Sequence, residues 1–364
     1  MAAPRYRELR QGGKRAEGGT CKAGPSASGH RVSPRVPALA ALLLSSCATY
    51  GYDGPRSDHF DGQRFHNRAP TPPLEVGELL EWALTSDRRP WDWIDEPPGA
   101  PPPTRLGGGH LRVTFINHAT TLVQMDGLNV LTDPVYADVV GPLGVGVRRQ
   151  RAPGIRFEDL PPIDVVLVSH NHYDHMDFPT LRRLAARDRP RILVGLGNAA
   201  LLRESGVEGG EDLDWDGAIE VAPGVRVHGV PVHHSSRRGL GDADVTLWLG
   251  FVLEGPSGRV YYAGDTAFGP HFAEVEARFG APRLAILPIG AYRPRRFLAR
   301  MHMSPEEAAR AHRALRAEES LGVHWGTFQL SDEGRLDPLR DLRAALRPGE
   351  RFYTLAHGAA REVP

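Results

Sequence analysis

The sequence predicts an α/β fold in which two mixed sheets carry helices on their outer sides. Short apolar runs recur from Leu111 to the C-terminus, and segments with helical spacing separate several of them. Four of the runs end in histidine or aspartate, at the point where a strand would pass into a loop. Because loops at one end of a sheet can converge on a pocket, we expect a polar functional site there.

Length and composition exclude several classes of protein. A chain of 364 residues that is 41% apolar and 24% charged can bury a large core, so a wholly disordered or fibrous protein is excluded. The 41 glycines and 32 prolines follow no fixed period, which excludes a collagen-like chain. No stretch reaches the roughly 18 to 20 consecutive apolar residues that a helical membrane span requires.

The net charge of zero conceals an uneven distribution. Residues 1–46 hold eight of the 44 basic residues and two of the 44 acidic ones, which leaves 36 bases and 42 acids in the rest. The rest of the chain therefore has a net charge of −6. Because nucleic acid is also negatively charged, we do not expect it as a partner.

Residues 1–47 are predicted to contain a secretory signal, whose layout runs from Arg31 to Cys47. Two arginines precede the apolar stretch Val36–Leu44, and Leu44-Ser45-Ser46-Cys47 resembles a bacterial lipobox, in which the cysteine is acylated. The long basic leader predicts that residues 1–31 lie upstream of the true start. We expect a lipid anchor at Cys47 on the periplasmic side of the cell envelope; the alternative is a cytoplasmic protein with a disordered tail. Because Cys21 lies in the removed part, no disulfide is expected.

Residues 48–110 are polar and rich in proline, including the run PPGAPPP. The proline run makes the chain stiff, and the following GGG makes it flexible again. This segment is therefore predicted to be a tether that wraps the folded body. A short amphipathic helix is predicted at Leu74–Leu84. The folded domain is predicted to span 111–364.

Local signals within the predicted domain place several elements. Asp126-Gly127 between two apolar segments predicts a hairpin. The continuous apolar run Val165–Val168 predicts a strand buried on both faces, and helical spacing follows from Phe178. Ser304–Glu307 combines a capping box with proline at the first helical position, which predicts the start of a helix.

The polar residues that end four predicted strands are nitrogen and oxygen ligands. They are His170, His172, Asp174, His175, His234, Asp265 and His324. Imidazole and carboxylate without thiolate suit zinc or another borderline divalent ion. Seven ligands are too many for one ion, but three plus three with one shared carboxylate suit two ions roughly 3.5 to 4 Å apart. The sequence therefore predicts a site for two divalent metal ions, with Zn²⁺ favoured.

Several motifs carry a resemblance to a known family. HNHYDH at 170–175, AGDT at 263–266 and HWGTF at 324–328 resemble the metallo-β-lactamase superfamily. Within it, NHATTLVQMDGLNVLTDP, LPIGAY and MSPEEAARAH are most similar to the branch of N-acylphosphatidylethanolamine-hydrolysing phospholipase D. The likeness extends from about residue 111 to the end. It implies an αββα sandwich with the metals at one rim.

The resemblance also implies how the ligands divide. One metal would be held by His170, His172 and His234, and the other by Asp174, His175 and His324, with Asp265 as the bridge. His233 immediately precedes the family's ligand position, and VHHSSRRG departs there from the animal enzymes, so His234 is favoured over His233 on motif alignment alone.

Asp174, His302 and Asp133 are the candidate catalytic residues. Asp133 would support the metal loop by bonding to a ligating imidazole, and the alternative is a turn aspartate before Pro134. His302 matches a family histidine near the substrate phosphate, where it could steady developing charge or protonate the leaving oxygen; the alternative is a surface histidine. His118 is expected near the pocket floor without assigned chemistry, and His312 as a packed helix residue.

The implied activity is metal-assisted hydrolysis of the phosphodiester between phosphatidate and an N-acylethanolamine, with water activated between the ions. The expected partner is a phospholipid or another small phosphodiester or ester, with peripheral membrane contact through a lipidated Cys47. An alternative is a lactonase or small-molecule phosphodiesterase of the same fold. An alternative of another class is a non-catalytic envelope lipoprotein that binds a ligand; the presence of all seven candidate ligands favours the enzyme.

Overall fold

The structure is a computed structural model that describes residues 50–364, apart from 72–75, 87 and 89. Contacts divide the chain into Met1–Ser45 and Ser46–Pro364, and every described residue belongs to the second unit. The predicted signal segment, with Cys21 and Cys47, lies outside the described residues. Within the described part, no helix has both the length and the apolar character needed to cross a bilayer.

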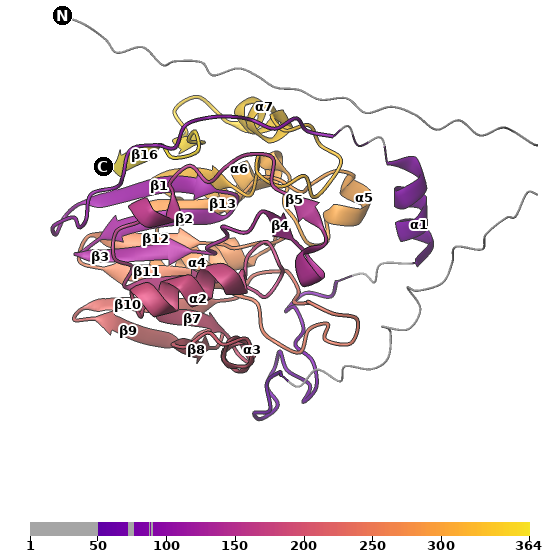
Figure 1. Cartoon of the computed structure of the whole chain (residues 1–364), viewed down its shortest axis with the longest axis horizontal. Coiled ribbons are helices and arrows are strands. Elements are labelled where there is room, and N and C mark those ends of the chain that lie inside the picture. The colour runs from indigo at the N-terminus through magenta and orange to yellow at the C-terminus, as the bar shows by residue number, and fades with distance from the viewer. Residues whose placement is uncertain (1–49, 72–75, 87, 89) are drawn as a thin grey trace, which may run out of the picture. The chain divides into compact units, whose positions relative to one another are not determined.

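Two seven-stranded mixed sheets form the body (Figure 1). The first sheet runs, in spatial order, through β16 (Ala360–Val363), β1 (Leu111–Asn117), β2 (Thr120–Met125), β3 (Leu128–Thr132), β6 (Val165–Val168), β7 (Arg191–Gly195) and β8 (Gly210–Leu213). The second runs through β15 (Phe352–Tyr353), β14 (Glu319–Val323), β13 (Leu284–Pro288), β12 (Gly258–Tyr262), β11 (Gly250–Gly255), β10 (Val225–Val230) and β9 (Ala218–Ala222). Each sheet joins an antiparallel part to a parallel part, as expected for mixed sheets.

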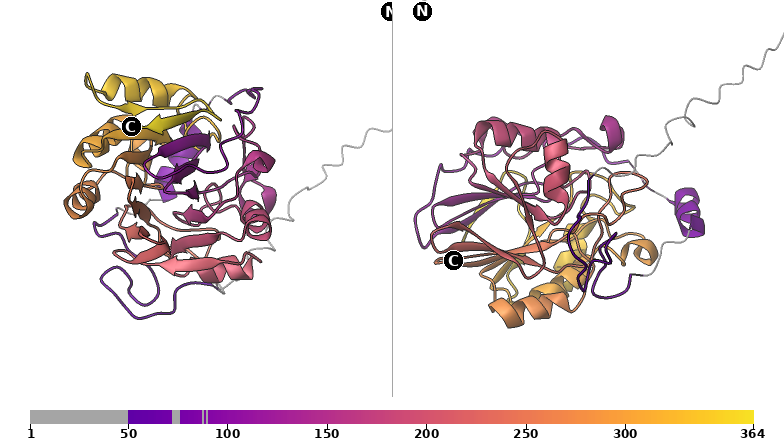
Figure 2. Two further views of the ribbon diagram at one scale, coloured as in Figure 1. Left: turned by 90° about the vertical axis from the view of Figure 1, so that its left-hand side faces the viewer. Right: turned by 90° about the horizontal axis from the view of Figure 1, so that it is seen from below.

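Helices cover the outer sides of both sheets, so that the layers follow the order helix, sheet, sheet, helix (Figure 2). The first sheet packs against α2 (Phe178–Arg187) and α3 (Asn198–Glu204), and the second against α4 (His271–Phe279), α6 (Pro305–Ala314) and α7 (Asp337–Ala345). The smaller elements are α1 (Val76–Thr85), α5 (Arg295–Leu298), the 3-10 turns Pro142–Gly144 and Phe157–Asp159, and a hairpin of β4 (Val139–Val140) and β5 (Val147–Arg148). The predicted αββα sandwich is confirmed.

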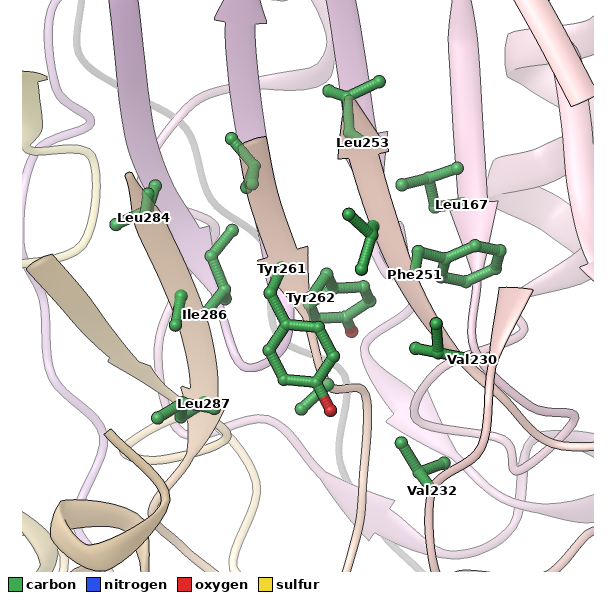
Figure 3. Packing of buried hydrophobic residues seen from close by; sticks show 14 of the residues in the cluster. Leu167, Val230, Val232, Phe251, Leu253, Tyr261, Tyr262, Leu284, Ile286 and Leu287 are labelled. Atoms are coloured by element: carbon green, nitrogen blue, oxygen red, sulfur yellow. The ribbon is translucent and has the colours of Figure 1, made fainter. Parts of the chain in front are cut away.

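The main core lies between the two sheets (Figure 3). Side chains on β6 alternate: Leu167 packs between the sheets with Phe251, whereas Val166 and Val168 pack on the other face with α2. All of β6 is buried, as its unbroken apolar run predicts. β6 is thus held on both faces, and the loop that follows it starts from a fixed point.

The local signals also hold. The β2–β3 turn contains Asp126 and Gly127 with φ of 49° and 79°, the left-handed pair that a tight hairpin requires. Ser304 caps α6, with its side chain accepting the N–H of Glu307 and its own N–H donating to the Glu307 carboxylate.

The Pro-rich segment contributes to the folded body. The first strand of the main sheets begins at Leu111, as expected, but Phe60 and Phe65 are buried in the main core and pair with each other in an isolated bridge. His59 Nε2 also lies 2.8 Å from Oδ1 of Asp214. These residues were not anticipated as core, because two phenylalanines without a periodic pattern give no signal of a strand or helix.

Candidate metal centre

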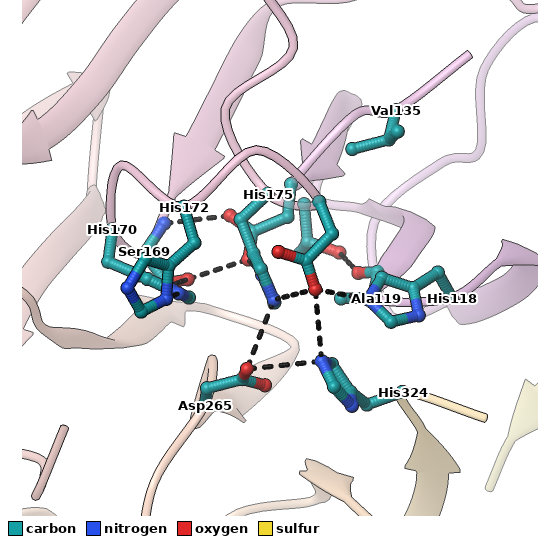
Figure 4. Close-up of polar contacts among 12 residues, drawn as sticks. His118, Ala119, Val135, Ser169, His170, His172, His175, Asp265 and His324 are labelled. Atoms are coloured by element: carbon teal, nitrogen blue, oxygen red, sulfur yellow. Dashed lines mark hydrogen bonds and ion pairs between the residues drawn. The ribbon is translucent and has the colours of Figure 1, made fainter. Parts of the chain in front are cut away.

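The seven predicted ligands meet at one rim of the sandwich, where β6, β12 and β14 end. Figure 4 labels five of them, namely His170, His172, His175, Asp265 and His324. The loop after β6 carries four of them, and His234 follows β10. Asp265 follows β12 and His324 follows β14. Because these strands run in the same direction within their sheets, their C-terminal loops converge.

The ligand atoms form two groups. In the first group, Nε2 of His170 lies 2.8 Å from Nδ1 of His172, and Nε2 of His234 lies 3.3 Å from the same nitrogen. In the second group, Oδ2 of Asp174 lies 3.4 Å from Nε2 of His175 and 3.5 Å from Nε2 of His324. In each group the ligand atoms lie within 4.8 Å of one another, close enough to hold a metal ion.

Asp265 lies between the two groups. Its Oδ2 is 3.2 Å from Nε2 of His175, 3.1 Å from Nε2 of His324 and 4.0 Å from Nε2 of His234. The carboxylate is buried and faces ligands of both groups. This is the geometry that a shared carboxylate requires.

The cluster fits a pair of divalent cations. Among the described residues, Nε2 of His175, Nε2 of His324 and Oδ1 of Asp265 are buried and have no hydrogen-bond partner. Both imidazole nitrogens lie at ion-pair distance from Oδ2 of Asp265, and a cation between these atoms would also satisfy Oδ1, since a buried polar group without a partner costs free energy. The donors are nitrogen and oxygen only, as zinc and similar borderline ions accept.

A layer of hydrogen bonds fixes the orientation of the imidazoles. Oδ2 of Asp133 lies 2.5 Å from Nδ1 of His175, and Asp133 also accepts the backbone N–H of Ser169 at 2.7 Å and its hydroxyl at 2.6 Å. Ser169 Oγ lies 2.9 Å from Nδ1 of His170, and Nδ1–H of His234 donates to the Met301 carbonyl at 3.0 Å. These contacts leave each Nε2 facing the cluster.

The remaining histidines occupy different environments. Nδ1 of His302 lies 3.7 Å from Oδ2 of Asp265, so His302 borders the cluster. His233 points elsewhere, with Nε2 2.9 Å from Oγ1 of Thr71. His312 is a buried residue of α6 with Nδ1 2.8 Å from Oγ of Ser320.

His118 is a site residue to which sequence reasoning assigned no chemistry. Its Nε2 lies 2.9 Å from Oδ2 of Asp174, and its ring centroid lies 4.0 Å from that of His324. The signal was available, because His118 directly follows an apolar strand just as the predicted ligands do.

The protonation of the metal-free cluster follows from burial and charge. Burial lowers the pKa of His170 and His234 well below the usual range and that of His172 to about 4, so these imidazoles are neutral. Burial would also lower the pKa of His324, but the charge of Asp265 outweighs it and raises the pKa to about 9. Although burial acts the other way, His324 and His175 hold the pKa of Asp265 well below its usual range. The carboxylate is therefore ionised and can bind a cation.

Comparisons with known proteins agree with this geometry. The chain matches the model of the beta-lactamase superfamily domain over residues 128–325. It is 36% identical to N-acyl-phosphatidylethanolamine-hydrolyzing phospholipase D 1 of Caenorhabditis elegans, over 70% of this chain and 76% of the relative. It is 32% identical to a metal-dependent hydrolase of Methanopyrus kandleri, over 60% of this chain and 85% of the relative.

Among solved structures, the fold is similar to Igni18, a metallo hydrolase from Ignicoccus hospitalis. The TM-score is 0.53 at 22% identity, over 70% of this chain and 98% of that one. The matched segment 128–325 contains all seven candidate ligands, Asp133 and His302. The chain belongs to the metallo-β-lactamase superfamily, as a metal-dependent hydrolase near the branch of N-acylphosphatidylethanolamine-hydrolysing phospholipase D.

Proposed function

We propose that this protein is a phosphodiesterase of phospholipase D type that hydrolyses N-acylphosphatidylethanolamine-like lipids with two metal ions. The proposal rests on one observation: Asp265 lies between two groups of candidate metal ligands and faces both of them. The Caenorhabditis elegans relative, whose name states this lipid as its substrate, supports the choice of substrate.

In this reaction the candidate ligands would divide between two metal ions. His170, His172 and His234 would hold one ion, and Asp174, His175 and His324 the other, with Asp265 shared. Bound divalent ions, of which Zn²⁺ suits these donors best, lower the pKa of water towards 7 and stabilise negative charge on phosphoryl oxygens.

Two further residues act beside the ligands. Asp133 holds His175 in one tautomer from behind. His302, at the edge of the cluster, is placed to offer a hydrogen bond to the phosphoryl group or to the departing oxygen.

The test combines metal content with a substrate panel. Purified chain should contain about two divalent ions and should release phosphatidate and N-acylethanolamine from N-acylphosphatidylethanolamine in mixed micelles. A chelator should abolish the release, and the metal should restore it. Turnover of lactones or small phosphodiesters alone would reject the lipid as substrate. A chain that binds no metal when supplied with it would reject the enzyme in favour of a binding protein.

A lipid anchor at Cys47 would suit this substrate, since it would hold the protein at a membrane surface. One acyl chain alone binds only reversibly, whereas two acyl chains on Cys47 would give a stable attachment. Mass spectrometry of the amino-terminal peptide from the native host tests the anchor: a diacylated Cys47 supports it, and an unmodified one rejects it.

A further inference from the structure

Strongly exposed apolar side chains gather at the metal end of the sandwich. Among the described residues the large ones are Leu84, Trp93, Leu143, Val145, Leu240 and Leu336. Each lies on a segment that contacts the loops around the metal centre. Turns at the other end, such as β2–β3, β9–β10 and β11–β12, hold Asp126–Gly127, Pro223–Gly224 and Pro256–Ser257. Single exposed apolar residues are ordinary, but their concentration at one end is not.

The β4–β5 hairpin is built to project two of these side chains. Leu143 is 93% exposed and Val145 is 74% exposed. At the neck of the loop Gly141 and Gly146 pack so closely that a Cβ on either would come within 2.1 Å of a backbone oxygen of the other strand. Leu143 has a φ of 53°, a left-handed conformation that a leucine adopts only at an energetic cost. An apolar side chain therefore stands at a position where glycine or asparagine would be less strained.

The base of this hairpin packs against the metal centre. Val140 and Val147 form a small cluster with Phe328, and Tyr173 packs against it. Tyr173 lies between the ligands His172 and Asp174 in the chain. The hairpin thus lies beside the metal loop, at the end of the sandwich where β4, β5 and α5 lie in Figure 1.

A second projecting loop meets the same tyrosine. The Tyr173 hydroxyl donates to the Arg238 carbonyl at 2.8 Å, and the Arg238 guanidinium lies 3.9 Å from the centroid of the Tyr173 ring. Asp242 accepts the N–H of Gly239 at 2.7 Å and closes this loop, which leaves Leu240 76% exposed. The apolar tips of two separate loops therefore flank one residue of the metal loop.

Basic side chains accompany both tips. Arg148 ends the hairpin in β5 and Arg237 begins the second loop; both are exposed, and neither is ion-paired within the described part of the chain. Arginine beside protruding apolar side chains fits the charge of phospholipid headgroups above the acyl boundary. A protein partner would instead need roughly 800 Å² of continuous matched surface, which separate protrusions do not offer.

We propose that the hairpin tip Pro142–Val145 and Leu240 insert into the interfacial region of a phospholipid bilayer and seat the metal end on it. This inference rests on the proposed function, because it takes the substrate to be a membrane lipid. It assigns the membrane contact to folded loops beside the metal loop, independently of any anchor at Cys47.

The test measures sedimentation with vesicles of phosphatidylcholine, with and without phosphatidylglycerol. The full chain carries Cys47→Ala in every sample so that no acyl chain contributes. The parent should bind, and Leu143→Asp with Val145→Asp, or Leu240→Asp, should weaken binding by at least about tenfold, since each places a charge in the apolar layer. The matched control Pro223→Asp, on the β9–β10 turn, should bind as the parent does.

Turnover of a water-soluble phosphodiester separates docking from catalysis. The loop variants should keep the parent's rate on it and lose rate only on vesicle-borne lipid. Vesicle binding without any phosphodiester hydrolysis would reject the proposed function and leave the docking surface standing. Absence of vesicle binding by the parent, or equal binding by the loop variants, would reject the docking surface. If Leu143→Asp only converted a dimer to a monomer, the tip would be an interface between copies and the proposal would be wrong.

Discussion

His118 contacts Asp174 directly, with the imidazole Nε2 2.9 Å from Oδ2 of the carboxylate. The backbone carbonyl of His118 also accepts the N–H of His324 at 2.7 Å. Burial, together with the charge of His324, lowers the pKa of His118 to about 3, so its ring is neutral and has one N–H to donate. One residue at the end of β1 therefore holds two candidate ligands of the same metal ion.

We expect His118→Ala to weaken the second metal group selectively. Partners that orient ligands are typically worth about 10- to 100-fold in metal affinity or activity, and Asp174 would lose the donor at 2.9 Å. Metal titration followed by elemental analysis should show one tightly bound ion and one weakened ion. His312→Ala, in α6, is the control and should keep both ions; if His118→Ala also keeps both at full affinity, His118 does not position Asp174.

Much of the site could be predicted because its signals are local. A buried apolar run that ends in histidine or aspartate, as Val165–Val168 does before His170, indicates a ligand at a strand end whatever the rest of the fold does. The same signal places His118 at a strand end, but its contact with Asp174 was not predictable from it. It depends on a left-handed φ of 45° after β1 and on a partner 56 residues away. The core position of Phe60 likewise depends on tertiary packing alone.

Asp265→Asn should remove the shared carboxylate while the fold persists. The amide lacks the negative charge that both groups face, so the metal content should fall below two per chain. Activity should fall by more than about 100-fold, because even partners of ligands contribute 10- to 100-fold. Elemental analysis, circular dichroism and turnover check this. A folded variant with near-normal turnover would contradict the bridging role.

Asp133→Asn should lower metal affinity although it replaces no metal ligand. The carboxylate lies 2.5 Å from Nδ1 of His175 and accepts two hydrogen bonds from Ser169, so an amide cannot satisfy all of these contacts. We expect about a 10- to 100-fold loss of affinity at one ion, with restored activity at high metal concentration. A turn aspartate without this role would give unchanged affinity and only a lower melting temperature.

Glu319 lies away from the metal centre and should make the free energy of unfolding depend on pH. Burial alone would raise its pKa, but the hydrogen bonds and charge of Arg361, at 2.9 Å to each oxygen, outweigh burial and lower it. A carboxyl with a lowered pKa in the folded state stabilises fully above its unfolded pKa of about 4.3 and loses this contribution as pH falls through the folded pKa. Glu319→Gln should therefore cost on the order of 2 kcal/mol at pH 7 in urea unfolding. The difference in free energy of unfolding between the parent and the variant should narrow below about pH 4. A difference that does not depend on pH would contradict the lowered pKa of Glu319.

His302→Ala should separate the chemical step from metal binding. His302 borders the cluster 3.7 Å from Asp265, and burial lowers its pKa to about 4, so at neutral pH it acts as a neutral hydrogen-bond donor. Removing such a donor typically costs about 10²- to 10³-fold in kcat when it stabilises charge that develops in the transition state. If His302 assists the departing oxygen, the loss should be large for esters of alkyl alcohols. It should be small for a p-nitrophenyl diester, whose leaving group needs no help. Metal content should stay at the parent's value. Equal losses for both leaving groups would place His302 at the phosphoryl oxygens instead, and loss of metal would make it a ligand.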